Sequence, residues 1–231
     1  MIDLQTLTYH KIDTLYHRDP DKKNIIIPGQ YANPACEFLL HNEWQFTEKI
    51  DGTNIRLIYE AGNLTIKGRK SNSDLSGPIA KWYQENMSSL LEKFTSVFGD
   101  SSAIVFGEGY GNGIQSGGNY GEPSFIVFDV LVPANDDELI DYWWLKRESV
   151  EDIAEGLGLD IVPKFTMTLH EAILKVEKGM TSQWGNFIAE GLVGIPAVPL
   201  LNRNGSRIVT KIKHRDFVQL HKALSGDKRF S

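Results

Sequence analysis

Seven short runs of β-branched and aromatic residues constrain the fold of this chain more than any other feature of its sequence. Runs of this length and composition, bounded by Gly, Asn, Asp or Pro, are typical of β-strands. The runs are WQFTEK (44–49), NIRLIYE (54–60), LTIKGRK (64–70), AIVFGE (103–108), SFIVFDVLV (124–132), FIAEGLVGI (187–195) and RIVTKIKH (207–214). Between them, Asp51-Gly52 and Gly62-Asn63 have the residue types of tight hairpin turns, so each is predicted to join two antiparallel strands.

Helical periodicity is strongest between residues 77 and 99, where apolar residues recur at steps of three or four. Weaker helical patterns occur near 147–157 and 169–178, and a C-terminal helix is predicted at about 214–225. The combination predicts an α+β fold with mainly antiparallel β-sheets and flanking helices. Because neither internal repeats nor a low-complexity linker interrupts the sequence, residues 1–231 are expected to form a single domain.

The composition is that of a folded intracellular protein. Hydrophobic residues make up 41% of the 231 residues, which is enough for a sizeable core. The single cysteine, Cys36, excludes an internal disulfide and a multi-cysteine zinc site, and it fits a reducing compartment. The N-terminal residues lack the apolar run of a signal peptide, and no segment approaches the ~18 apolar residues of a membrane span. A soluble protein without membrane contacts is therefore expected in the cytoplasm, that of a host cell if the chain is phage-encoded.

The net charge of −6 argues against a protein that coats nucleic acid, because such proteins carry an excess of Lys and Arg. The charge is uneven, however. Residues 129–160 carry ten acids against two bases, whereas residues 203–231 carry eight bases against two acids. A basic face can therefore exist despite the negative total, so nucleic-acid binding is not excluded.

Lysines near the predicted strand ends have two interpretations. In the stretch EKIDGTN, Lys49 is either a solvated neighbour of the Asp51-Gly52 turn or a nucleophile held at the end of a strand. Lys211 and Lys213 share one face of their run, beside apolar residues. Burying two lysines there requires an anion, whereas an edge strand would turn them to water, a common way to prevent aggregation. Taken alone, the strand pattern favours the edge strand.

Two glutamates are candidate site residues. Glu108 stands in the glycine-rich segment FGEGYGNGIQ, which has neither the Gly-Lys-Ser/Thr of a phosphate-binding loop nor the glycine spacing of a dinucleotide-binding loop. By itself, this segment is equally typical of a flexible loop. Glu190 interrupts an apolar strand pattern, so a metal, a lysine or a ribose hydroxyl is expected beside it. The six histidines form no metal-binding pattern, and no G-x-S-x-G motif of a serine hydrolase is present.

Taken in order, five motifs resemble those of the covalent nucleotidyltransferase superfamily of polynucleotide ligases and mRNA-capping enzymes. They are EKIDGTN, FGEGYGNGIQ, FIVFDVLV, AEGLVG and IVTKIK, and they span Lys49 to Lys213. The pattern K-x-D-G-x alone is common by chance, but five motifs in the family order are not. The GNGIQ sequence after Glu108 and the asparagine at position 54 resemble most the corresponding motifs of ATP-dependent RNA ligases of the phage RNA ligase 2 type. The resemblance implies an adenylyltransferase fold of the ATP-grasp-like ligase kind, as a catalytic domain without an OB-fold.

The resemblance also implies how ATP would react. Lys49 attacks the α-phosphate, releases pyrophosphate and becomes lysyl-AMP; the AMP then passes to an RNA 5′-phosphate, and a 3′-hydroxyl completes the joint. Glu190 helps to bind Mg²⁺, while Lys211 and Lys213 contact the α-phosphate. A lysine attacks only as the neutral amine, although its ordinary pKa is about 10.4, and nearby cations favour that neutral form. The α-phosphate would supply the anion that the two strand lysines need.

Six further residues are implied to bind the nucleotide or the RNA end. They are Glu48 beside the adenine, Ile50 next to the nucleophile, Asn54 and Arg69 near the phosphates or the RNA end, Glu108 on the ribose, and Phe128 stacked on the adenine. Stacking of a base on an aromatic side chain contributes ~1–3 kcal/mol.

Two features depart from the family pattern. The fourth motif usually continues with a base but here reads Gly194-Ile195-Pro196, so either Arg203 or Arg207 serves instead or substrate handling differs. Only 18 residues follow Lys213, so we expect a minimal ligase, or one that uses a partner protein in place of a C-terminal domain. One alternative is a minimal ATP-dependent DNA ligase, which the RNA-ligase-like motifs disfavour. The other is a nucleotide- or RNA-binding module without catalysis, which the intact motif residues disfavour.

Overall fold

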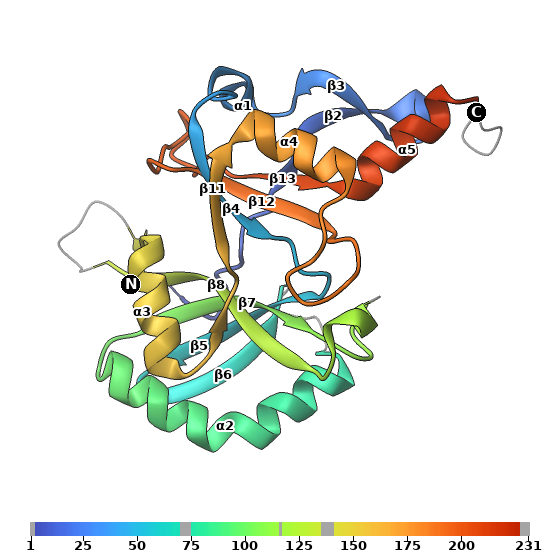
Figure 1. The fold of residues 1–231 in the computed structure, drawn as a ribbon. Helices are drawn as coiled ribbons and strands as arrows, with labels where there is room; N and C mark the ends of the chain where they lie inside the picture. Colours follow the sequence, from blue (N-terminus) through green and yellow to red (C-terminus); the bar gives the residue numbers. More distant parts are fainter. Residues whose placement is uncertain (1–2, 70–74, 116, 135–140, 227–231) are drawn as a thin grey trace. The chain divides into compact units, whose positions relative to one another are not determined.

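A computed structural model describes residues 3–69, 75–115, 117–134 and 141–226 of the chain (Figure 1). The chain divides into two compact units. Unit 1 comprises residues 1–10 and 51–162, and unit 2 comprises residues 11–50 and 163–231. The chain therefore passes from one unit to the other after His10, Ile50 and Val162. Three groups considered above lie outside the described residues: Lys70, the acids at 136–138, and the bases at 228 and 229.

Unit 1 is built on a six-stranded sheet, in which β10, β8, β7, β5 and β6 follow one another and β9 pairs with β8. The strands are β5 (Thr53–Glu60), β6 (Asn63–Gly68), β7 (Ala103–Tyr110), β8 (Ser124–Pro133), β9 (Tyr142–Trp144) and β10 (Asp160–Ile161). All pairs are antiparallel except β10 with β8. Ala61 and Gly62, with φ of +49° and +74°, form the two-residue turn between β5 and β6. The predicted hairpin is therefore confirmed, with its turn one residue earlier than the expected Gly62-Asn63.

Helices cover one face of the unit 1 sheet. The long helix α2 (Gly77–Phe98) crosses this face, and α3 (Arg147–Leu157) packs beside it (Figure 1). Apolar side chains of α2, such as Ile79 and Phe94, share a buried cluster with Leu57 of β5. On the other face, Leu4 of the N-terminal segment packs with residues of the middle strands. A short 3₁₀ helix, η2 (Gly117–Tyr120), follows the glycine-rich segment.

Unit 2 is built on a five-stranded sheet in the order β1, β13, β12, β4, β11. Its strands are β1 (Asp13–Thr14), β4 (Glu43–Glu48), β11 (Lys164–Thr168), β12 (Gly191–Pro196) and β13 (Thr210–Lys213). β1 is parallel to β13, and the other neighbours are antiparallel. A separate two-stranded sheet contains β2 (Tyr16–Asp19) and β3 (Ile25–Tyr31), which η1 (Pro20–Lys22) connects.

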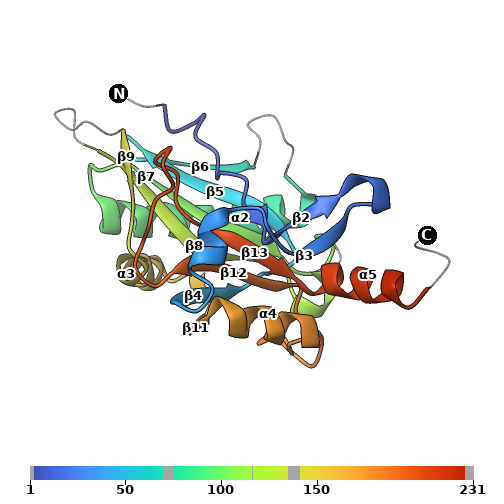
Figure 2. The ribbon, with the colours of Figure 1, turned by 90° about the horizontal axis from the view of Figure 1, so that it is seen from above.

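In the described part of unit 2, the α-helices are α1 (Pro34–Phe38), α4 (Leu169–Lys178) and α5 (His214–Leu224). The helix α5 stands where the C-terminal helix was predicted. Figure 2 shows α4 beside β12 and α5 continuing from the end of β13. The core of the unit contains Trp44 and Phe46 of β4, which are fully buried, together with Val176 of α4 and Phe217 of α5.

The turn predicted at Asp51-Gly52 is not a hairpin. β4 pairs with β11 and β12, whereas β5 pairs with β6 and β7, so the segment between β4 and β5 joins two different sheets. Pairing with distant strands has outweighed the local turn preference. Gly52 has another role, because a Cβ there would lie 2.3 Å from the carbonyl oxygen of Gly109. Only a glycine allows this close approach to the backbone of β7.

Other boundaries differ from the prediction as well. The strand expected over 187–195 begins only at Gly191, and the one expected over 207–214 shortens to Thr210–Lys213. The prediction also missed β3, whose Pro28 and Gly29 argue against a central strand but fit a two-stranded sheet. The predicted α+β fold with mainly antiparallel sheets and flanking helices is nevertheless confirmed.

Candidate active site

Three charged side chains meet in unit 2. The Nζ atom of Lys49 lies 2.7 Å from Oε2 of Glu190, and the Nζ atom of Lys213 lies 2.6 Å from Oε1 of the same carboxylate. The three side chains expose between 12% and 23% of their surface. Glu190 therefore joins the two lysines in a cluster that is shielded from solvent but still accessible.

Three neighbouring strands bring this cluster together. Lys49 directly follows β4, Glu190 directly precedes β12, and Lys213 ends β13. The backbone N–H of Lys49 donates to the carbonyl of Gly191 at 2.9 Å. Gly191 has a φ of +153°, and a Cβ there would lie 1.9 Å from the carbonyl oxygen of Ile212. The strand pairing that assembles the cluster therefore requires a glycine directly after the glutamate.

The lysines set the charge of Glu190. Burial alone would raise the pKa of this carboxyl group, but Lys49 and Lys213 hold the pKa below its ordinary value of 4.5. Glu190 is therefore ionised at neutral pH and offers each lysine a negatively charged partner. Of the three partners expected for Glu190, the structure shows lysine.

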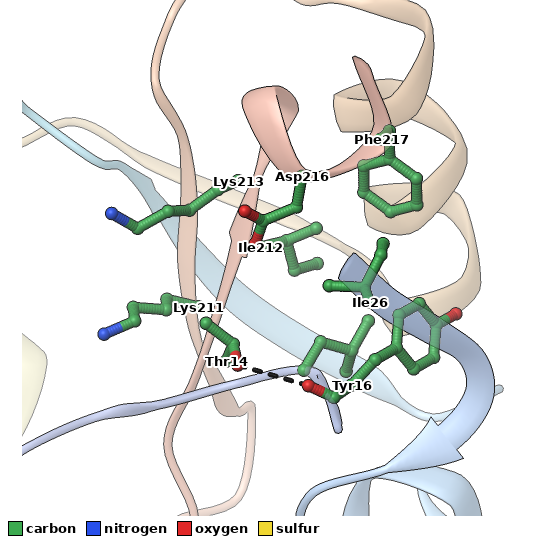
Figure 3. Close-up of a pocket in the computed structure, with 9 residues that line it drawn as sticks. Thr14, Tyr16, Ile26, Lys211, Ile212, Lys213, Asp216 and Phe217 are labelled. Atoms are coloured by element: carbon green, nitrogen blue, oxygen red, sulfur yellow. Dashed lines mark hydrogen bonds between the residues drawn. The ribbon is translucent and has the colours of Figure 1, made fainter. Parts of the chain in front are cut away.

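Lys211 lies two residues before Lys213 on β13. Figure 3 shows the two amino groups extending to the same side of the strand, while Ile212 lies on the side of Phe217. Because β13 pairs with both β1 and β12, the edge-strand interpretation of these lysines is wrong. A cavity of about 10 Å³ beside them is lined also by residues of β1, β2, β3 and α5. It has room for about one water molecule.

Glu48 lies on the other side of β4 from Lys49, on the face that packs into the core. Glu48 is only 2% exposed. Oε1 accepts a hydrogen bond from Oγ of Ser182 at 2.6 Å, and Oε2 accepts one from the backbone N–H of Gln183 at 2.8 Å. Ile50, another residue of this unit that is expected to contact the nucleotide, is buried as well.

In unit 1, the four expected residues are carried by adjacent strands. Asn54 of β5 lies opposite Glu108 of β7 in the antiparallel register. Phe128 lies in β8, at the irregularity of the β7–β8 pairing, and Arg69 directly follows β6. The Oδ1 atom of Asn54 is buried and has no hydrogen-bond partner within the described part of the chain. Such an acceptor needs a donor, which a bound ligand can supply.

Phe128 belongs to an aromatic cluster in unit 1. Its ring centroid lies 5.0 Å from that of Tyr9, with an interplanar angle of 76°. Tyr9 also contacts Phe106 and Trp144, with centroid distances of 5.1 and 5.4 Å. The hydroxyl of Tyr9 donates to Asp129 at 2.9 Å. The N-terminal segment therefore fixes the ring that is expected to stack on adenine.

Arg56 of β5 is a fully buried base that the sequence analysis did not single out. Its Nε donates to the carbonyl of Gly68 at 3.1 Å, and Nη1 donates to the carbonyl of Leu7. Its Nη2 has no partner among the residues described. Burial lowers the pKa of this guanidinium. Arg56 thereby ties both the N-terminal segment and the end of β6 to β5.

Glu190 is the expected metal ligand. Among the described residues, no three His, Cys, Asp or Glu side chains come together in a group that could hold a metal ion. A divalent cation at Glu190 would therefore take its other ligands from phosphate oxygens and water. A carboxylate combined with such oxygens fits Mg²⁺.

None of the described helices is long and apolar enough to span a membrane.

A comparison with protein families matches residues 42–213 to the RNA ligase family. The matched range contains Lys49, Glu190 and Lys213, and it covers more than half of the chain. The chain belongs to the RNA ligase family.

Solved structures of Naegleria gruberi RNA ligase have a similar fold. An unliganded mutant superposes with a TM-score of 0.66 at 16% identity, covering 96% of this chain and 59% of that one. A mutant with ATP and Mn gives a TM-score of 0.64 at 16% identity, with 96% and 60% of the two chains covered. The structure with PPi gives 0.60 at 18% identity, with 96% and 64% covered. This chain thus spans about three fifths of the length of these relatives.

The structure of this RNA ligase family member brings together three of the residues expected to act in catalysis. Lys49 and Lys213 each contact Glu190, and the roles of the three residues in a reaction stay predictions. Sequence analysis missed Ser182, since no periodicity or motif marks a serine within a loop. It also missed Arg56, although a base in the middle of the apolar run NIRLIYE is a signal that could have identified it.

Proposed function

We propose that this chain is an ATP-dependent RNA ligase that forms lysyl-AMP at Lys49. The observation that carries this proposal is the contact of Lys49 with Glu190, and of Glu190 with Lys213, at 2.6–2.7 Å. Membership of the RNA ligase family supports the reaction class. The Naegleria gruberi RNA ligase structures with ATP or AMP and Mn support the use of an adenine nucleotide and a divalent metal.

In the first step, Nζ of Lys49 attacks the α-phosphorus of ATP. A phosphorus–nitrogen bond forms, the bond between the α-phosphorus and the bridging oxygen breaks, and pyrophosphate leaves. The amine must have lost a proton before it attacks. Nζ of Lys49 contacts the Glu190 carboxylate at 2.7 Å, so the attack requires this contact to open.

Positive charge in unit 2 would stabilise the phosphoryl group during transfer. Lys211 and Lys213 contact the α-phosphate in this proposal, and fixed charges of this kind supply the largest part of catalysis in phosphoryl transfer. Glu190 would hold Mg²⁺, which adds positive charge at the phosphate when it is bound. The two lysines and the carboxylate already have the composition that this chemistry needs.

Residues of unit 1 would recognise the nucleoside. We assign the ribose to Glu108 and the adenine ring to Phe128, while Asn54 and Arg69 serve the phosphates or the RNA end. The Oδ1 of Asn54, which is buried and has no hydrogen-bond partner among the residues that the structure describes, supports a ligand contact at this position. In unit 2, Glu48 and Ile50 are proposed on the adenine side of Lys49.

The later steps use RNA ends. AMP passes from Lys49 to an RNA 5′-phosphate, and a 3′-hydroxyl then displaces AMP to form the new phosphodiester. Residues 1–231 are proposed to act as one catalytic domain in the cytoplasm. A partner protein is required for sealing only if the purified chain forms lysyl-AMP and does not join ends by itself.

A labelling experiment tests the first step. The chain is incubated with Mg²⁺ and α-labelled ATP or GTP, and covalent label is sought after denaturing electrophoresis. We expect label with ATP, none with Lys49→Ala, and normal label with Lys81→Ala, which removes an exposed lysine of α2. Absence of label with ATP, or undiminished label in Lys49→Ala, would refute the proposal.

A sealing experiment tests the substrate. Nicked duplexes and single-stranded ends are prepared in RNA and in DNA, each with a 5′-phosphate and a 3′-hydroxyl. We expect joining of the RNA ends. Efficient sealing of nicked DNA without sealing of RNA would instead identify a minimal DNA ligase.

A further inference from the structure

Glu48 and Ser182 form a buried contact close in the chain to Lys49 and Glu190. Both oxygens of the Glu48 carboxylate accept a hydrogen bond from the segment that contains Ser182 and Gln183, at 2.6 and 2.8 Å. Glu48 is 2% and Ser182 is 7% exposed. Hydrogen bonds between a buried carboxylate and such donors are strong and geometrically demanding.

The segment held by Glu48 is a closed loop that leads directly into Glu190. Its ends are joined by a hydrogen bond from the N–H of Ala189 to the carbonyl of Met180 at 2.9 Å, and Thr181 pairs with Ile188. Nearer the tip, the N–H of Ser182 donates to the carbonyl of Phe187 at 2.8 Å. A shift of the loop would therefore move the residue that follows Ala189, which is Glu190.

Ser182 is the central residue of this contact. Its Oγ donates to Glu48 and accepts a hydrogen bond from the backbone N–H of Trp184 at 3.1 Å. The hydroxyl thus uses its single proton on Glu48, and only a carboxylate accepts from both Ser182 and Gln183. An amide in place of Glu48 would present its NH₂ group to one of these two donors, and one hydrogen bond would be lost.

The contact also fixes the position of the nucleophile. Glu48 directly precedes Lys49, whose backbone N–H donates to the carbonyl of Gly191. The chain around Glu190 is therefore hydrogen-bonded to residues 48 and 49 on both sides. Before Glu190, Ser182 and Gln183 donate to the Glu48 side chain. After Glu190, the carbonyl of Gly191 accepts from the backbone N–H of Lys49. Neither Ser182 nor Gln183 is required to touch ATP for this.

We propose that Glu48 and Ser182 are positioning residues, which set the Glu190 carboxylate between Lys49 and Lys213. The inference rests on the proposed function, because Lys49 and Glu190 are its adenylylation residues. It deepens that function by giving the carboxylate of Glu48 a task other than reading the adenine. The two roles differ in what they predict for kinetics. Substitution of a residue that recognises adenine changes the affinity for ATP and the preference for ATP over GTP. Substitution of a positioning residue changes the rate of the chemical step.

Single-turnover adenylylation separates the two roles. Rates are measured over a range of ATP and GTP concentrations for the wild type, Ser182→Ala, Ser182→Thr and Glu48→Gln. Ser225→Ala is the matched control, because its exposed hydroxyl donates within its own helix end, to the carbonyl of Lys222. Thermal unfolding of each variant is recorded alongside the rates.

We expect Ser182→Ala to lower the maximal adenylylation rate by about 10- to 100-fold, as misplacement of reacting groups does. The half-saturating ATP concentration and the ATP preference should stay as in the wild type, and Ser182→Thr should recover most of the rate. The inference is overturned if Ser182→Ala reacts at the wild-type rate, or if its main effect is on ATP affinity or on the ATP preference. Failure of Ser182→Thr to exceed Ser182→Ala, with both folded, also overturns it.

Amide hydrogen exchange provides a readout that does not depend on activity. The N–H of Gln183 should exchange slowly in the wild type and much faster in Glu48→Gln and Ser182→Ala. Unchanged exchange in folded variants would overturn the inference even if the rates fell. If the wild type takes no label from ATP, the proposed function fails, and the exchange experiment still decides whether the contact holds the loop.

Discussion

Unit 1 carries 8 bases and 19 acids, a net charge of −11, whereas unit 2 carries 16 bases and 11 acids, a net charge of +5. The net charge of −6 for the whole chain is therefore an average over two regions of opposite sign. A nucleic-acid enzyme can be acidic overall and still concentrate cations in the region that handles phosphate. For such a protein, the charge of each unit is the more informative quantity.

The two units also differ in how they accommodate a base with low exposure. In unit 2, Lys49 and Lys213 share the carboxylate of Glu190. In unit 1, Arg56 donates to the backbone carbonyls of Leu7 and Gly68. The first arrangement leaves a charged cluster that can exchange partners with a ligand, and the second fastens the fold. This contrast is consistent with the proposed tasks, in which unit 2 carries out the phosphoryl chemistry and unit 1 contributes the residues for the ribose and the stacking on adenine.

The largest expected effect tests the charged cluster of unit 2. Glu190→Ala removes the shared partner of Lys49 and Lys213, together with the proposed metal ligand. We expect the adenylylation rate to fall by about 10²–10³-fold, as when one preorganised electrostatic group is lost. Labelling with α-labelled ATP under single-turnover conditions measures it. Glu177→Ala, on α4, is the control. A Glu190→Ala rate close to that of the wild type would remove phosphoryl chemistry from this cluster.

A pair of variants sharpens the contrast between the units. Phe128→Ala in unit 1 should raise the half-saturating ATP concentration by about 5- to 150-fold, which corresponds to the loss of ~1–3 kcal/mol of base stacking. Lys213→Ala in unit 2 should act mainly on the maximal rate. Phe38→Ala, which removes an exposed ring, is the control. The reverse pattern, with affinity lost in Lys213→Ala and rate lost in Phe128→Ala, would exchange the tasks assigned to the two units.

Helix caps give a smaller test in which the units differ. In unit 2, Thr168 and Glu171 form a capping box at the start of α4. In unit 1, the N-cap residue of α2, Ser76, makes no side-chain cap hydrogen bond. Thr168→Ala should therefore lower the free energy of unfolding by about 1 kcal/mol, and Ser76→Ala by much less. Urea denaturation measures both, and equal losses would show that the cap of α4 has no special weight.

The smallest expected effect is a pH dependence of the same capping box. Hydrogen bonds from Thr168 hold the pKa of Glu171 below its ordinary value of 4.5. A carboxyl group with a lowered pKa in the folded state stabilises the protein above the pKa of its unfolded state, and this contribution is lost as the pH falls through the folded pKa. The stability advantage of the wild type over Glu171→Gln should thus be present near pH 7 and shrink as the pH falls below the ordinary value of 4.5. An advantage that grows in acid contradicts this assignment.

Local signals in the sequence predicted local structure well. The hairpin between β5 and β6 depends on alternating residues and a turn at Gly62, all within one stretch of the chain. The Asp51-Gly52 segment has the same kind of signal, but β4 finds its partners in β11 and β12, far along the chain. Local turn propensity gives no information about competing pairing with strands far along the chain. The β3 strand was missed for a related reason, since Pro28 is unfavourable in a central strand and acceptable where only one neighbour pairs.

Site residues could be predicted where the residue type is unusual for its place in the sequence pattern. A carboxylate in an apolar run had to have a partner, and Glu190 has two lysines. The shared face of Lys211 and Lys213 followed from strand alternation (Figure 3). The contact of Glu48 with Ser182 left no such mark, because it depends on a loop fold that brings a serine back to β4. Hydrogen bonds of that kind become visible only in three dimensions.

The identity of the modified residue is the most direct test of the central claim. The protein is incubated with ATP and Mg²⁺, digested, and its peptides are analysed by mass spectrometry. We predict one added AMP group on the peptide that contains Lys49, attached to its Nζ, and no adduct in Lys49→Arg. An adduct located instead on Lys211 or Lys213, or an adduct that persists in Lys49→Arg, would contradict the account.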